Sequence, residues 1–267
     1  MSGLAAVTFS LTAYAQAAKG GGISESMLRD IRKAQVQTTA DKALFNAIAA
    51  NSIDNLAQNH ANAVELDTYF SNETKTQSIT DQKQSGRCWM FSGLNVLRAD
   101  FAKKTDSLTV DFSQDYLFFY DQLEKANLFL QGVVDCAKKP MDDERVRFFF
   151  QHPLNDGGTF CGVADLTEKY GLVPKSVMPE TFSSDNTNRM SGLIKSKLRE
   201  FGLQLRDMVN AGKKPAAIEA EKTKMLTTVY RMLSMTLGEP PSEFTYVFKD
   251  GKGRPVGEPK TYTPKSF

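Results

Sequence analysis

The sequence is poor in histidine and in net charge. It has two histidines among 267 residues, and 33 Lys and Arg residues stand against 31 Asp and Glu residues, which leaves a net charge of +2. A charge this balanced argues against nucleic acid or a membrane surface as the main partner. No stretch is long and apolar enough to cross a bilayer. Hydrophobic residues make up 41% of the chain, enough to fill the core of one large domain or of a domain with an insertion.

Cysteine is also scarce, and the three cysteines form no C-x-x-C pair. This spacing gives no sign of a metal site, and we expect neither a metal nor another cofactor. An odd count leaves at least one thiol unpaired within the chain. If Cys88 is that thiol, Cys136 and Cys161 remain. They either form a disulfide in an oxidising compartment or are two reduced thiols in the core.

The first residues resemble an export signal without its basic start. Residues 4–15 are apolar and small, and no charge precedes Lys19. Ala13-Tyr14-Ala15 has the small-x-small pattern at which signal peptidase cuts, but the basic n-region is missing. Either the true start lies upstream of Met1 or the pattern arose by chance. We predict a signal-like segment and flexible lead-in over 1–22 and an exported protein, periplasmic or extracellular; without a real signal it would be cytoplasmic.

A helix is predicted to begin at Cys88. Apolar residues spaced 4, 3 and 4 apart lie on one face of this helix: Met90, Leu94, Leu97 and Phe101. Cys88 therefore lies in the first turn, where unpaired N–H groups and the helix dipole favour the thiolate, which is the nucleophilic form. A cysteine on a helix is more often a small buried hydrophobe. The neighbours of Cys88 reverse that expectation.

Four residues around Cys88 complete the pattern of a cysteine-nucleophile site. Gln82 can loop back so that its amide donates to a developing oxyanion alongside the Cys88 N–H. Gly86 lets the backbone pass close to a bound substrate. Arg87 adds positive charge beside the thiol, and Trp89 is expected to pack under the helix and shield the site. We predict Cys88 as the nucleophile and Gln82 as the oxyanion donor.

The run 82–92 resembles the nucleophile segment of papain-like cysteine peptidases. It is most similar to the branch of bleomycin hydrolase and aminopeptidase C, because Ser85 stands where papain tends to have a second cysteine. The resemblance extends from about Asp41 to the last residue. Further matching stretches, in family order, are Phe112-Ser113-Gln114-Asp115-Tyr116-Leu117, Asn155-Asp156-Gly157-Gly158, Glu168-Lys169-Tyr170-Gly171-Leu172-Val173-Pro174-Lys175 and Tyr262-Thr263-Pro264-Lys265-Ser266-Phe267.

The resemblance implies an α+β, papain-like fold and removal of N-terminal residues from peptides through a Cys88 acyl-enzyme. It places Gly157 and Gly158 at the subsites just N-terminal to the scissile bond, where a glycine pair lets a peptide backbone lie close. With Asp156 and Trp89 they form the predicted substrate-binding set. The alternative is an ordinary Asn-Asp-Gly-Gly turn.

Neither histidine stands where the family has its general base. His60 lies in a polar stretch and is interpreted as a surface residue, and His152 is interpreted as structural although it precedes the glycine turn. Family spacing, extended by an insertion of roughly 55 residues, puts the base near position 280 or later. We therefore interpret the chain as an N-terminal fragment that is inactive by itself. The alternative is a non-catalytic fragment that binds peptide or serves as a scaffold.

Hydrophobic periodicity and the positions of capping and helix-breaking residues predict a largely helical chain. We expect a helical half with the catalytic cysteine over 23–182, a helical hairpin over 183–241 and the start of a truncated β-rich half over 242–267. The hairpin resembles the hook by which this family builds ring-shaped homo-oligomers, and a solvated hairpin without a partner is the alternative. The predicted helices cover about 24–34, 41–50, a stretch after 52, a stretch from 88, a stretch from 113, 141–150, a stretch ending at 171, 188–209 and 215–237. An extended arm is predicted over 64–80. The predicted strands cover 244–249 and 260–263.

Overall fold

The computed structural model describes residues 22–62, 67, 69–74, 78–105 and 108–267. The predicted signal-like segment lies outside the described residues apart from residue 22, and so does part of the predicted arm over 64–80. The chain divides into two compact units, Met1–Phe70 and Ser71–Phe267, and each is described here by itself.

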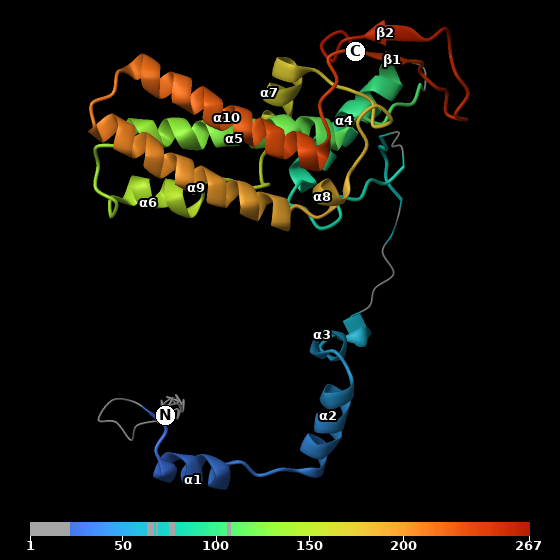
Figure 1. Cartoon of the computed structure of the whole chain (residues 1–267). Helices are drawn as coiled ribbons and strands as arrows, with labels where there is room; N and C mark the ends of the chain where they lie inside the picture. The colour runs from blue at the N-terminus through green and yellow to red at the C-terminus, as the bar shows by residue number, and fades with distance from the viewer. Residues whose placement is uncertain (1–21, 63–66, 68, 75–77, 106–107) are drawn as a thin grey trace, which may run out of the picture. The chain divides into compact units, whose positions relative to one another are not determined.

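The first unit consists of short helices that local capping explains (Figure 1). Ser24 is the predicted N-cap, and its side chain accepts a hydrogen bond from the Met27 N–H. The second helix begins two residues earlier than predicted, because Thr38 and Asp41 form a reciprocal capping box. The elements are α1 (Glu25–Ala34), α2 (Thr39–Ala50), α3 (Ile53–Leu56) and the 3₁₀ turn η1 (His60–Asn62).

The second unit contains the nucleophile segment and is mostly helical. Its elements, in chain order, are α4 (Cys88–Lys104), α5 (Gln114–Asp135), α6 (Glu144–Gln151), α7 (Phe160–Tyr170), α8 (Phe182–Asp185), α9 (Asn188–Asn210), α10 (Pro215–Leu237), β1 (Phe244–Tyr246) and β2 (Lys260–Tyr262). None of the helices among the described residues is long and apolar enough to span a membrane.

Helix α5 is the centre of this unit. It begins where the predicted cap Ser113 accepts a hydrogen bond from the Tyr116 N–H at 3.0 Å. Its first turns are buried on every side, polar Gln114 and Asp115 included. The reason is that α4, α7, α9 and α10 all pack against α5. A periodicity argument that finds one apolar face cannot anticipate a helix enclosed in this way.

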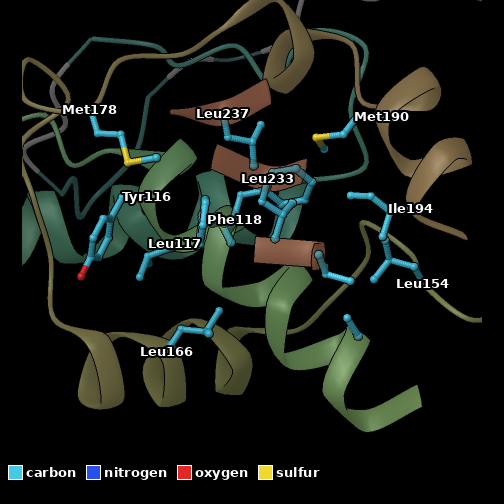
Figure 2. Packing of buried hydrophobic residues seen from close by; sticks show 14 of the residues in the cluster. Tyr116, Leu117, Phe118, Leu154, Leu166, Met178, Met190, Ile194, Leu233 and Leu237 are labelled. Atoms are coloured by element: carbon cyan, nitrogen blue, oxygen red, sulfur yellow. The ribbon is translucent and has the colours of Figure 1, made fainter. Parts of the chain in front are cut away.

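The predicted hairpin is α9 and α10, and it is packed rather than solvated. Both helices run alongside α5, with α6 beside α9 and α5 (Figure 1). Pro215 opens α10 and Gly212, at a φ of 70°, makes the break between the helices, both as predicted. The predicted boundary at 182/183 falls inside α8, so the hairpin and the helical half share one core. Figure 2 shows part of that core: Tyr116, Leu117, Phe118, Leu154, Leu166, Met178, Met190, Ile194, Leu233 and Leu237.

Three predicted elements, one helix and both strands, are shorter in the structure. Helix α6 begins at Glu144 rather than near 141, because the Asp143 side chain accepts hydrogen bonds from the first turn and fixes the start there. The strands form a two-stranded antiparallel sheet with Phe244 opposite Tyr262. Lys249 lies outside that ladder and makes only isolated bridges, one of them to Pro255, which has no N–H to extend the pairing.

The last residues pack against the turn that ends α7. Gly171 has a φ of 79°, which suits the glycine predicted there. A Cβ on Gly171 would lie 2.0 Å from the carbonyl oxygen of Pro264. The Leu172 N–H donates to that oxygen at 2.9 Å. Two of the family-like stretches are therefore in direct contact, and only glycine fits between them.

Candidate active site

Cys88 is the first residue of α4, and its thiol is exposed. The N-cap residue of this helix, Arg87, makes no side-chain cap hydrogen bond. The inner side of the first turns is anchored by Met90 and Leu94, both fully buried. Cys88 therefore lies exposed at the start of a helix, as the sequence predicted, and its role as nucleophile stays a prediction.

Gln82 lies at the start of a tight loop, residues 82–87, that we call the nucleophile loop. Its side-chain amide donates to the Ser85 carbonyl oxygen at 2.6 Å, and the Ser85 hydroxyl donates to the Gln82 carbonyl oxygen at 2.6 Å. Between them Lys83 has a φ of 53°, a left-handed conformation that is uncommon for lysine. The reciprocal bonds hold the half-buried glutamine in place. Its role as oxyanion donor stays a prediction.

Arg87 differs from its predicted role. The side chain is buried and forms an ion pair with Glu180 at 2.8 Å, and it also donates to the Ser184 carbonyl oxygen at 2.8 Å. Its guanidinium lies over two aromatic rings, 5.1 Å from each centroid. Because Glu180 compensates its charge, Arg87 holds the nucleophile loop in place and is not a bare positive charge beside the thiol.

Beneath this ion pair lies Asp115, in the first turn of α5 and with no exposed surface. The pKa of its carboxyl is raised to about 8, mainly by burial and also by nearby Glu180, while Arg87 opposes the shift. The carboxyl is therefore mostly protonated at neutral pH. A buried acid directly under a nucleophile helix has no signal in the sequence, since an Asp after a Ser N-cap is ordinary helix chemistry.

Trp89 forms one side of the site with the glycine loop, which we define as residues 155–158. The indole N–H donates to the Asp156 carbonyl oxygen at 2.7 Å. A Cβ on Gly158 would lie only 2.5 Å from the ring, whereas a Cβ on Gly157 would make an ordinary contact of 3.4 Å with Asn155. The two predicted glycines therefore differ: packing against Trp89 requires Gly158, and no described neighbour forbids a side chain at Gly157.

The Asp156 carboxylate bonds to the protein itself. It accepts hydrogen bonds from the Gly86 N–H at 3.3 Å, from the Thr187 hydroxyl, and from the Ser191 hydroxyl at 3.3 Å. Asp156 thus connects the glycine loop to the nucleophile loop and to the start of α9. Substrate contacts for Asp156, Gly157, Gly158 and Trp89 stay predictions.

Sequence reasoning missed Lys125, which braces the glycine loop from α5. Its ammonium donates to the carbonyl oxygens of Asn155 and Gly157 at 3.0 and 2.6 Å and pairs with Asp121 at 2.7 Å. It also lies 5.6 Å from the centroid of the Trp89 ring. The spacing of four residues between Asp121 and Lys125 is typical of an ion pair on one helix face. The contacts of Lys125 with a loop some 30 residues away cannot be predicted from that spacing.

The two histidines lie in different units of the chain. His152 ends α6, is exposed and packs against Phe148 with ring centroids 5.3 Å apart. His60 is exposed in η1 of the first unit. Among the described residues, neither imidazole has a hydrogen bond or ion pair, and their interpretation as residues outside the catalytic set stays a prediction.

The other two cysteines are unpaired and lie in different environments. Cys136 is buried at the end of α5, where its thiol donates to the Gly132 carbonyl oxygen at 2.9 Å. Cys161 is exposed in the first turn of α7. Of the two alternatives, the structure therefore has free thiols, although only Cys136 is a core residue.

An exposed cysteine at the open start of a buried helix, with a glutamine loop before it and a double-glycine loop beside it, defines the nucleophile half of a papain-like cysteine peptidase fold. The chain belongs to the Peptidase C1-like family, whose sequence model matches residues 22–267. The predicted family and fold class are both confirmed.

Several known proteins are similar to this chain. Aminopeptidase C of Lactobacillus delbrueckii subsp. lactis is 42% identical over 222 residues, covering 83% of this chain and 49% of the relative. Human bleomycin hydrolase is 41% identical over 174 residues, covering 64% and 38%. The crystal structure of PepW from Lactobacillus rhamnosis HN001 matches with a TM-score of 0.79 and 38% identity, covering 91% of this chain and 55% of that one. The chain spans about half the length of these relatives or less.

Proposed function

We propose that this chain supplies the nucleophile half of a cysteine peptidase that removes N-terminal residues from peptides. The observation that carries the proposal is Cys88, exposed at the uncapped start of α4 and adjoining the nucleophile loop that holds Gln82. The names of the similar proteins, aminopeptidase C and aminopeptidase G among them, support the substrate class.

In the proposed reaction the Cys88 thiolate attacks the carbonyl carbon of a peptide bond. The carbonyl π electrons move to oxygen, and the Gln82 amide and the Cys88 N–H stabilise that oxyanion. Collapse of the tetrahedral species breaks the C–N bond, and the leaving amine takes a proton from a histidine imidazolium. The resulting thioester is then hydrolysed by a water molecule that the neutral imidazole deprotonates, which releases the acid and restores the thiolate. The imidazole is assigned by family resemblance to a histidine other than His60 and His152.

The test uses thiol reactivity and turnover separately. In the 267-residue chain, iodoacetamide should alkylate Cys88 much faster than Cys161, the matched exposed thiol in the first turn of another helix, while buried Cys136 serves as the protected control. In a protein of the relatives' full length that carries this chain, aminoacyl fluorogenic substrates should be hydrolysed, and Cys88→Ala should abolish the activity. Equal labelling of Cys88 and Cys161, with no Cys88-dependent turnover, would leave a peptide-binding or scaffold role.

We further propose self-association through the hairpin formed by α9 and α10. One side of the hairpin packs on α5, while its outer surface exposes apolar side chains such as Leu203 and Met235. Light scattering coupled to size exclusion decides this: Leu203→Lys with Met235→Lys should reduce an assembled protein to a monomer.

We also propose export, which the small-x-small pattern Ala13-Tyr14-Ala15 supports. Export predicts a mature chain that begins at Gln16, which N-terminal sequencing of secreted protein would detect.

A further inference from the structure

The nucleophile loop receives much of its support from the start of the hairpin. We define the hairpin root as residues 184–191, the end of α8 and the first turn of α9. The Gln84 N–H donates to the Asp185 carbonyl oxygen at 2.9 Å, and the Thr187 N–H donates to the Gln84 carbonyl oxygen at 3.4 Å. The Asn186 amide adds a bond to the Gln84 side chain at 3.1 Å. The loop thus pairs with the root as a short parallel bridge.

Two charged side chains strengthen this connection at the C-terminal end of the loop, one at Arg87 and one that bonds to Gly86. Arg87 reaches the root through the Ser184 carbonyl oxygen at 2.8 Å. Asp156 accepts one hydrogen bond from Gly86 in the loop and two from the root, from Thr187 and Ser191. The carboxylate lies at the N-terminal end of α9, where the helix dipole favours negative charge.

The two hydroxyl groups that bond to Asp156 belong to buried residues. Thr187 and Ser191 are only 1% and 4% exposed, so water does not readily replace their bonds. Thr187 is the N-cap of α9, yet its hydroxyl accepts no cap bond from the helix, and it donates to Asp156. The start of α9 therefore orients a carboxylate whose other hydrogen-bond partner lies two residues before Cys88.

We propose that Asp156, held by Thr187 and Ser191, is a positioning residue through which the hairpin root sets the geometry of the nucleophile loop. The inference rests on the proposed function, because it assigns the oxyanion and nucleophile groups to that loop. Gly86 lies between Gln82 and Cys88, and displacements of about 1 Å at such groups lower rates by about 10²-fold. A force that shifts the hairpin, such as self-association, would consequently alter the reactivity of Cys88.

The experiment compares variants of the 267-residue chain by hydrogen exchange, alkylation and thermal melting. Thr187→Val keeps the shape and removes the donor, Thr187→Ser restores the hydroxyl, and Asp156→Asn removes the charge. Thr227→Val is the control, since the Thr227 hydroxyl donates to the Thr223 carbonyl oxygen within α10, away from the hairpin root. Peptides from 82–91 report the loop, and peptides from α5 report global opening.

Thr187→Val and Asp156→Asn should raise exchange in 82–91 by about tenfold, the size expected for the loss of one buried hydrogen bond. Exchange in α5 should change no more than in Thr227→Val, alkylation of Cys88 should change at least severalfold, and Thr187→Ser should behave as the parent chain. Unchanged exchange in 82–91, or an equal rise in α5, would overturn the proposal. If Cys88 in the parent chain reacts no faster than Cys161, the proposed function fails, while the exchange result still decides whether Asp156 positions the loop.

Discussion

Gly158→Ala provides a sharp test of how the glycine loop is built. The added Cβ would lie 2.5, 2.6 and 2.7 Å from three atoms of the Trp89 ring, whereas ordinary contacts begin at 3.4 Å, so the ring must retreat by about 3.4 − 2.5 = 0.9 Å. The ring is confined on other sides by Gly162, where a Cβ would be 3.2 Å away, and by the Lys125 ammonium. Retreat also stretches the 2.7 Å bond from the indole to Asp156.

The size of the effect follows from these contacts. Overpacking costs about 1–3 kcal/mol, and the lost hydrogen bond adds about 0.5–1.5 kcal/mol. Replacing glycine by alanine lowers the conformational entropy of the unfolded chain, which offsets about 0.4–1 kcal/mol of this loss. The net free energy of unfolding should fall by about 0.5–4 kcal/mol, which lowers Tm by roughly 1–16 °C for a chain of this size.

Trp89 is the only tryptophan, so its fluorescence follows the same event without a label. In Gly158→Ala the emission maximum should move to longer wavelength as the indole is displaced toward water, and urea unfolding should give the free-energy change. Gly157→Ala is the matched control, because its Cβ meets only Asn155 at 3.4 Å, and it should stay within about 1 kcal/mol of the parent. Equal stability and unchanged emission in Gly158→Ala would refute the packing argument.

Three further predictions concern the groups around Cys88. The folded pKa of Asp115, about 8, lies above its ordinary value of 3.8. Its contribution to stability is therefore full below about pH 4 and is lost as the pH rises to 8. The urea midpoint of Asp115→Asn should match that of the parent near pH 4 and exceed it at about pH 8–9. Glu180→Gln leaves the Arg87 charge buried without compensation and should cost about 3–5 kcal/mol in urea unfolding, whereas Arg87→Met combined with Glu180→Leu should recover most of that loss. In an active full-length protein, Gln82→Ala should lower kcat by about 10²–10³ with little change in KM; a rise in KM alone would assign Gln82 to substrate binding.

The features that the sequence predicted well are local. Ser24 and Ser113 cap helices through their own side chains, and Pro215 starts α10 because its ring suits a first turn. Cys88 at a helix start belongs to the same class of inference. Each depends on residues within one or two turns, so a single sequence contains the necessary information.

The features that it did not predict depend on distant partners. The sequence shows that Arg87 is charged, but the burial of its side chain depends on Glu180, 93 residues away. Asp156 looked like part of a turn, and its bond to Thr187, 31 residues on, decides which way the carboxylate points. The two glycines of the glycine loop are identical in sequence, and only the position of the Trp89 ring distinguishes them.

The contact between the turn after α7 and the last residues has a consequence for biosynthesis. Phe112 packs against Phe267 with ring centroids 6.3 Å apart, and Leu172 bonds to Pro264. These pairings cannot form until the ribosome has added the 267 − 112 = 155 residues after Phe112, which takes roughly 8–30 s at ordinary elongation rates. The contact between these family-like stretches is therefore among the last to form, because its two sides are separated by so much of the sequence.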